Sequence, residues 1–167
     1  MNALLKHCLL AAALLLAQLA SAQTPAVTST LVARRVETVA GKQVLTAADS
    51  GKPGDTFEYA GTYRNAGPRP ADKLVATLPV PAGTTFVAGS ADPAPRAQAS
   101  VDGVRFAPMP LMRTVRQADG STRQEPVPLA DYRFVRWDLG TLAPGADAVV
   151  KLRVQIDSAA TAAASQN

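Results

Sequence analysis

Apolar and polar residues alternate with a period of two along several short stretches of this chain, which is the pattern of half-buried β-strands. The clearest stretch is residues 147–156, where every second residue is apolar: Ala148, Val150, Leu152, Val154 and Ile156. The residues between them are mostly charged or polar. This stretch is therefore predicted to form a strand with one face on a core and the other in solvent.

Two further stretches show the same alternation. In residues 55–64, the aromatic side chains of Phe57, Tyr59 and Tyr63 share one face with Gly61. In residues 132–139, the only tryptophan of the chain, Trp137, lies on the apolar side. A large side chain with one polar group suits a buried position that offers a hydrogen-bond partner. We therefore expect Trp137 to anchor the core between two sheets.

Two Asp-Gly pairs predict hairpins. Asp102-Gly103 separates residues 98–101 from residues 104–107, which is the pattern of a tight two-residue turn. Asp119-Gly120 separates residues 111–117 from residues 121–127 in the same way. Because proline cannot donate to a sheet ladder, the prolines at 108, 110, 126 and 128 place this second ribbon at the periphery.

Strand patterns recur through the chain with turn signals about every 8–12 residues, and no helical periodicity occurs after the first 22 residues. About eight to ten short strands with such spacing predict an all-β fold. An immunoglobulin-like β-sandwich is the favoured version.

The first 22 residues have the pattern of a secretory signal peptide. Lys6 precedes an apolar run over residues 8–20, which ends in the small-x-small sequence Ala20-Ser21-Ala22. The run is shorter than the ~20 residues that a membrane-spanning helix needs. We therefore expect an exported protein, periplasmic or at the cell surface, with no membrane span after cleavage. The expected organisation is a signal peptide at 1–22, one domain at 23–157 and a flexible tail at 158–167.

Cleavage would remove His7 and Cys8, the only histidine and the only cysteine. The mature chain would then lack disulfides, thiol nucleophiles and imidazole-based triads, and no metal or cofactor is expected. Carboxylate chemistry is what remains for an enzyme. Asp55 and Glu58 lie three residues apart on a predicted strand, so their side chains face opposite sides. Asp131 and Asp138 are also an odd number of residues apart, so their side chains diverge in the same way. A carboxylate-based hydrolase is the least favoured hypothesis.

Three stretches, in order, carry a family pattern: Lys52-Pro-Gly-Asp-Thr-Phe-Glu-Tyr59 continuing to Arg64-Asn-Ala-Gly67, then Leu78-Pro-Val-Pro-Ala-Gly-Thr-Thr-Phe-Val-Ala-Gly-Ser90, then Trp137-Asp-Leu-Gly-Thr-Leu-Ala-Pro-Gly145. They resemble the bacterial conserved-repeat family known as domain of unknown function 11, over roughly residues 31–157. The resemblance implies an immunoglobulin-like sandwich on exported or surface proteins, used as a spacer or adhesive module, with no catalytic residue.

Several residues of these motifs have a structural reading of their own. Pro53-Gly54 and Pro144-Gly145 each suit a type II turn directly before a strand. Asn65 and Gly67 are expected to close the turn after the aromatic strand, because both residue types tolerate left-handed backbone conformations. Together with Trp137, these are the predicted structural residues.

Charge adds one candidate site. Without Lys6, 16 basic residues stand against 13 acidic ones, a net charge of +3, so nucleic acid is not an expected partner. The stretch 105–136 is nevertheless rich in arginine. If it forms an exposed ribbon, Arg113, Arg116 and Arg123 are candidates for binding an anionic envelope glycan or lipid. An envelope protein is the other expected partner, and the oligomeric state is open.

Overall fold

The computed structural model describes residues 26–47 and 49–158, and these residues form eleven strands and two short 3₁₀ turns. In chain order the elements are β1 (Val27–Val39), β2 (Lys42–Thr46), β3 (Thr56–Asn65), β4 (Ala71–Pro79), β5 (Thr84–Phe86), η2 (Ala94–Arg96), β6 (Ala97–Ser100), β7 (Ala107–Pro108), β8 (Met112–Arg116), β9 (Thr122–Pro126), η3 (Leu129–Asp131), β10 (Phe134–Leu142) and β11 (Asp147–Ile156).

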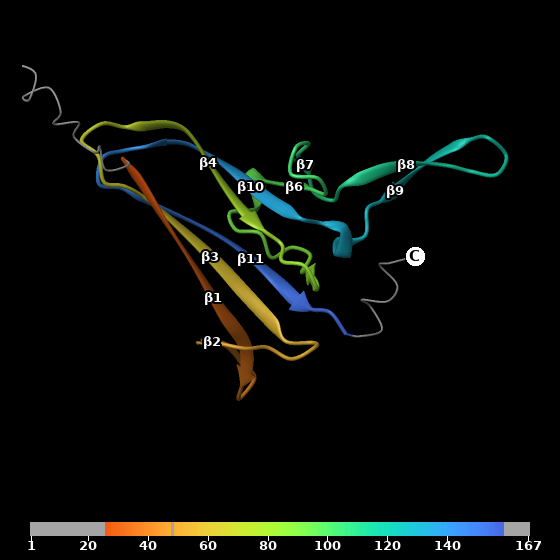
Figure 1. Ribbon diagram of the computed structural model, residues 1–167, viewed down its shortest axis with the longest axis horizontal. Coiled ribbons are helices and arrows are strands. Elements are labelled where there is room, and N and C mark those ends of the chain that lie inside the picture. Colours follow the sequence, from red (N-terminus) through yellow and green to blue (C-terminus); the bar gives the residue numbers. More distant parts are fainter. Residues whose placement is uncertain (1–25, 48, 159–167) are drawn as a thin grey trace, which may run out of the picture.

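The strands form two main sheets that pack as the layers of a sandwich (Figure 1). One sheet has the strand order β2-β1-β3-β11-β5, and the other has the order β4-β10-β6-β7. The pairs within both sheets are antiparallel. The prediction of an all-β, immunoglobulin-like β-sandwich is confirmed.

The alternation of the sequence is realised in the burial of the strands. In β11, the side chains of Val150 and Leu152 are fully buried, and Val154 is 1% exposed. β3 lies between β1 and β11, and its Phe57 faces the same core. Period-two burial follows because successive side chains of a strand point to opposite faces of the sheet.

Trp137 anchors the core, as its sequence context predicts. Its side chain is fully buried, and its indole N–H donates to the carbonyl of Pro93 at 3.1 Å. Tyr132 is equally buried, stacks on Phe86 with ring centroids 5.6 Å apart, and accepts the backbone N–H of Leu111 on its hydroxyl. Each buried aromatic residue thus has a partner for its polar atom.

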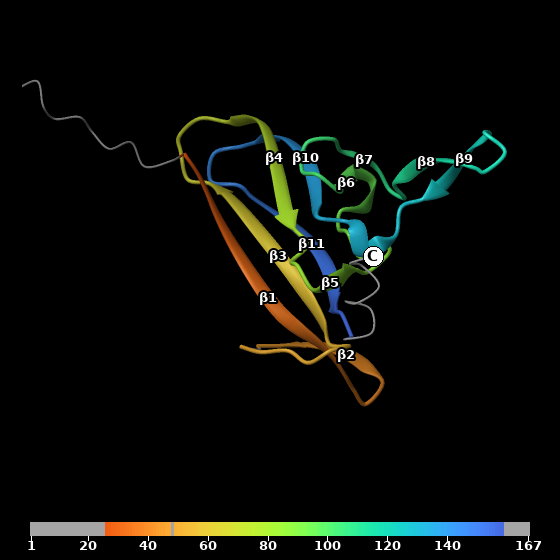
Figure 2. The ribbon, with the colours of Figure 1, turned by 45° about the vertical axis from the view of Figure 1, so that its right-hand side comes forward.

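The two predicted hairpins have different outcomes. β8 and β9 pair around Asp119-Gly120 as a separate two-stranded ribbon that projects from the sandwich (Figure 2), so the peripheral ribbon is confirmed. β6 and β7 also form a hairpin, but the prediction of a tight turn at Asp102-Gly103 is wrong. The strands end at Ser100 and resume at Ala107. The reason is local capping: the Ser100 hydroxyl accepts the N–H of Gly103, and Asp102 accepts the N–H of Val104, which together stabilise a longer loop.

The expected signal peptide at 1–22 lies outside the described residues, and so does the predicted tail apart from Ser158. Within the described part of the chain, no helix is long and apolar enough to span a membrane.

Candidate functional site

Both predicted Pro-Gly turns are present, each directly before a strand of the five-stranded sheet, β3 or β11. Gly54 has a φ of +89°, and the N–H of Asp55 donates to the carbonyl of Lys52 at 3.0 Å. Gly145 has a φ of +73°, and the same bond joins the N–H of Ala146 to the carbonyl of Ala143. Positive φ at the third residue is what a type II turn requires. Pro53 and Pro144 precede these glycines, and both turns have a structural role.

Asn65 closes the turn after β3 through its side chain. The side chain is fully buried, and its amide nitrogen donates to the carbonyls of Arg69 at 2.7 Å and Leu142 at 2.9 Å. Its amide oxygen accepts the N–H of Gly67 at 3.0 Å. Asn65 therefore joins the end of the five-stranded sheet to the last residue of β10 in the other sheet.

The mechanism predicted for this turn is wrong in one respect. Neither Asn65 nor Gly67 has a positive φ. Glycine is favoured at position 67 by space, because a Cβ there would lie 3.0 Å from the Cβ of Ala26 and 3.3 Å from the amide oxygen of Asn65. The turn is held by side-chain hydrogen bonds and a close approach, without a left-handed backbone.

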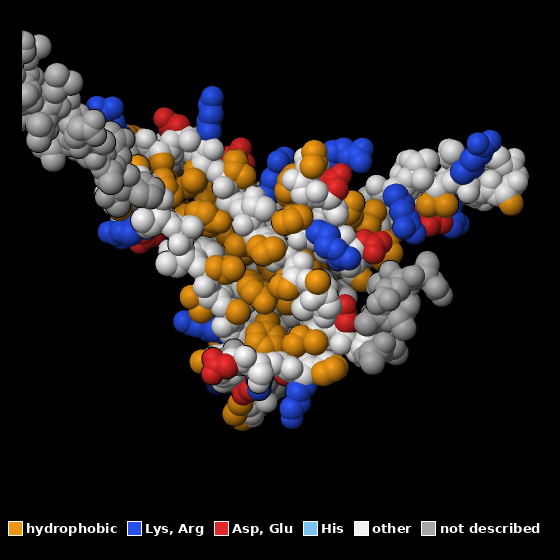
Figure 3. All heavy atoms as spheres, in the orientation of Figure 1, with side chains coloured by type: hydrophobic (Ala, Val, Ile, Leu, Met, Phe, Trp, Pro, Cys, Tyr) orange, Lys and Arg blue, Asp and Glu red, His pale blue; other side chains and the backbone are white. Residues whose placement is uncertain are grey.

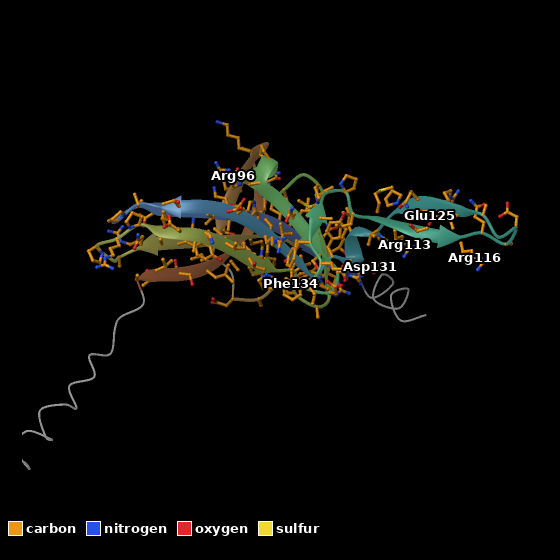
Figure 4. All side chains as sticks on the ribbon, turned by 90° about the horizontal axis from the view of Figure 1, so that it is seen from above. Arg96, Arg113, Arg116, Glu125, Asp131 and Phe134 are labelled. Carbon is orange, nitrogen blue, oxygen red and sulfur yellow. The ribbon has the colours of Figure 1, made fainter. Side chains whose placement is uncertain are left out.

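The structure separates the three arginines proposed for anion binding. Arg113 and Arg116 are three residues apart on β8, so their side chains leave opposite faces of the ribbon. Arg123 on β9 pairs with Val115, and Glu125 pairs with Arg113, which places Arg113, Arg123 and Glu125 on one face. Figure 4 shows Arg113, Arg116 and Glu125 along the ribbon.

Glu125 shares a face of the ribbon with two of these arginines, directly opposite Arg113 and two residues from Arg123. Arg123 donates to the Glu125 carboxylate, and the pair forms a salt bridge. The pKa of Glu125 is lowered chiefly by this hydrogen bond, then by the charge of Arg123 and, more weakly, by that of Arg113. The positive charge on this face is therefore partly neutralised, and Arg116 stands alone on the other face.

The carboxylates considered for hydrolysis either have basic partners or lie on different elements. Glu58 is 8% exposed and is held by Arg153, with Arg153 Nη2 2.9 Å from Glu58 Oε2. Asp55 accepts the N–H of Lys52 and lies 3.6 Å from Arg35. Asp131 lies in η3, and Asp138 lies on β10. Across residues 26–47 and 49–158, no cluster of three or more metal-ligating side chains occurs.

A feature that the sequence did not locate is the open edge of β1. This strand has 13 residues, but it pairs with β2 only over residues 35–39. Among residues 26–47 and 49–158, residues 27–34 therefore have β3 on one side and no strand on the other. Leu31 is 50% exposed and Val32 is 44% exposed. Apolar side chains gather nearby, between β3 and β4, on the face shown in Figure 3.

The open segment of β1 lacks the devices that protect other edges. It reads Val-Thr-Ser-Thr-Leu-Val-Ala-Arg, with no proline and one charge, which lies at its end. By contrast, β4 carries Asp72, Lys73 and Pro79, and Lys73 has a φ of +54°. β5 and β7 have only three and two residues. Charges, prolines and short length are the usual protection against strand pairing with another chain.

Comparison with known proteins found no match to this chain among family models, curated proteins or solved structures.

Proposed function

We propose that this chain is an exported, non-enzymatic immunoglobulin-like module that binds an extended segment of another envelope protein at the open edge of β1. The observation that carries the proposal is the unpaired, nearly uncharged edge of residues 27–34. The order of the Pro-Gly, Asn-x-Gly and Trp motifs supports membership of the domain of unknown function 11 family. The leader pattern supports export.

The backbone and side-chain groups of residues 27–34 indicate what kind of partner segment would pair with this edge. Alternate N–H and C=O groups of an edge strand point away from the sheet, and a strand from another chain satisfies them by continuing the ladder. Specificity then comes from side chains on the two faces of the added strand. Here those neighbours are Leu31 on the core side and Val32 on the outer side, opposite Gly61 and Ala60 of β3. A neutral segment with small or apolar residues fits this surface best.

The alternative, an anionic glycan or lipid bound by the ribbon, has less support. Arg113 and Arg123 share their face with Glu125, and Arg116 lies on the opposite face. A single ligand group cannot contact all three guanidinium groups from one side of a two-stranded ribbon. The carboxylate-based hydrolase has no pair of adjacent acidic side chains to support it among the candidates that the sequence raised.

Photo-crosslinking from the edge tests the proposal. A photoreactive residue in place of Thr30, whose side chain shares the outer face with Val32, would be introduced into the chain in its native host. The same residue in place of Val104, which is 80% exposed in a loop, is the control. We expect an adduct with a different envelope protein from position 30 and none from position 104.

A matched pair of variants then decides whether the edge binds that protein. Val32→Lys places a charge beside the open ladder, whereas Val104→Lys makes the same change of residue and charge in the loop. We expect Val32→Lys to weaken the purified complex at least about tenfold and Val104→Lys to leave it unchanged. Equal affinity of both variants, or an adduct of the chain with itself only, would contradict the proposal.

A further inference from the structure

The outer face of the four-stranded sheet carries a hollow of about 1020 Å³ that is separate from the edge of β1. The polar side chains that line it come from two segments that are distant in sequence: Arg96 and Gln98 from one, and Arg136, Asp138 and Thr141 from the other. Val75 and Pro108 add apolar surface, and Val75 is 50% exposed. The hollow thus combines several hydrogen-bonding groups with small apolar patches.

Arg136 is held in one position at this site. It lies opposite Gln98 in the pairing of β10 with β6, and the side-chain oxygen Oε1 of Gln98 accepts from Arg136 Nε at 3.0 Å and from Nη2 at 2.9 Å. The guanidinium carbon lies 4.1 Å from the ring centroid of Phe106. Within the described residues, Arg136 Nη1 makes no hydrogen bond. A guanidinium held by two partners in this way, at one edge and on one face, keeps one nitrogen for a ligand at little cost in side-chain entropy.

Arg96 supplies a second cation at the same hollow. It ends the turn η2, which is tied to the core because the preceding Pro93 carbonyl accepts the indole N–H of Trp137. In the described part of the chain, Arg96 has no ion pair or hydrogen bond from its side chain. Figure 4 shows it over the body of the sandwich, far from Arg113 and Arg116 on the ribbon.

The hollow also offers a hydrogen-bond acceptor. Asp138 uses Oδ1 to accept the N–H of Gly140 at 2.9 Å, at a point where the pairing of β10 with β4 is shifted. Its Oδ2 has no partner among the described residues, and neither has the amide nitrogen of Gln98. Two guanidinium groups against one carboxylate leave a net positive charge at the site.

From this arrangement we propose that the hollow binds an acidic saccharide. The acid group of the sugar pairs with Arg96 and the free nitrogen of Arg136, because guanidinium donors match carboxylate and phosphate oxygens. Sugar hydroxyl groups pair with Asp138 Oδ2 and the Gln98 amide, and Val75 and Pro108 contact the apolar face of a ring. The site does not depend on the open edge of β1, so either proposal can fail without the other.

Calorimetric titration of the purified protein tests the site with four probes: a galacturonate tetramer for carboxylate, mannose 6-phosphate for phosphate, maltotetraose as a neutral sugar and citrate as an anion without a sugar. We expect at least one acidic sugar to bind with a Kd in the millimolar range or tighter, and maltotetraose and citrate to bind at least about tenfold more weakly. No binding of either acidic sugar, or citrate binding as tightly, would overturn the proposal.

Variants locate the site. Arg136→Gln and Arg96→Gln should each weaken binding of the acidic sugar at least about tenfold, because each removes a charge-assisted hydrogen bond. Arg113→Gln and Arg116→Gln make the same change on the ribbon and should leave the affinity unchanged. The side chain of Arg96 forms no hydrogen bond or ion pair within the described residues, so Arg96→Gln keeps the test valid if Arg136→Gln is unstable. Equal loss in the ribbon variants would overturn the assignment.

Discussion

Replacing Asn65 tests how the two sheets are held together. Asn65→Ala removes three hydrogen bonds, to the carbonyls of Arg69 and Leu142 and from the N–H of Gly67. The N–H of Gly67 keeps its bond to the carbonyl of Ala26 at 3.2 Å, so the buried group that loses a partner is the carbonyl of Leu142. At about 1 kcal/mol for each bond, plus the cost of this buried carbonyl, unfolding should become easier by about 3–4 kcal/mol. In a domain of this size that lowers Tm by roughly 10–15 °C.

Asn65→Asp separates hydrogen bonding from simple loss of packing. The aspartate has nearly the shape of asparagine, but it turns a carboxylate oxygen toward two carbonyl oxygens in a buried site. We expect it to be less stable than Asn65→Ala at pH 7, since it adds repulsion and a buried charge.

The pH dependence of this variant has a defined sign. Burial beside two carbonyl groups raises the pKa of an aspartate in the folded state above the ~3.9 of an unfolded chain. The loss of stability caused by the ionised carboxylate is therefore complete at neutral pH. It decreases as the pH drops through the raised pKa of the folded state, and it is gone below the pKa of the unfolded chain.

Urea unfolding followed by fluorescence of Trp137, the only tryptophan, measures these differences. Gln117→Ala removes an exposed amide on the ribbon loop that forms no side-chain bond in the described structure, and it should change the free energy of unfolding by less than about 0.5 kcal/mol. The prediction is refuted if Asn65→Asp is at least as stable as Asn65→Ala at pH 7, or if the difference between their free energies of unfolding does not change with pH.

Three other substitutions give independent checks. Trp137→Phe removes the hydrogen bond to Pro93 and part of a fully buried side chain, so we expect a loss of about 2–3 kcal/mol in urea unfolding, followed here by circular dichroism because the variant has no tryptophan; a loss under 1 kcal/mol would contradict the anchoring role. Gly145→Ala places a Cβ on a residue with a φ of +73° and should cost about 1 kcal/mol; an unchanged Tm would argue against the type II turn. Arg123→Ala should raise the pKa of Glu125 toward its ordinary value in an NMR titration, because the hydrogen bond that lowers it is lost, and a constant pKa would refute that pairing.

The sequence predicts the elements whose burial depends on their own alternation. β3, β10 and β11 are central to their sheets, so one apolar face per strand is visible as every second residue. The same reasoning locates Trp137 in the core and the ribbon around Asp119-Gly120. The sequence also shows that Arg113 and Arg116 cannot share a face of the ribbon, because side chains an odd number of residues apart on a strand point to opposite faces.

The remaining features depend on contacts between distant segments. The open edge of β1 exists because β2 is five residues long and pairs only with the end of its neighbour, which no local pattern in residues 27–34 records. The hollow depends on Arg136 meeting Gln98, 38 positions earlier, through the register of β10 with β6. The loop after Ser100 shows that a local signal can also mislead. Its Asp-Gly pair predicts a tight turn, but hydrogen bonds from the backbone to the side chains of Ser100 and Asp102 stabilise a longer loop.

Amide hydrogen exchange in β1 tests the central claim most directly, with the free chain compared with its complex with the protein crosslinked at position 30. Residues 27–34 have an open side, whereas residues 35–39 of the same strand are already paired with β2 and serve as an internal control. The account predicts fast exchange at alternate amides of residues 27–34 in the free chain, slowed at least about a hundredfold in the complex, with residues 35–39 little changed. Protection confined to the four-stranded sheet or the ribbon, with residues 27–34 unaltered, would contradict it.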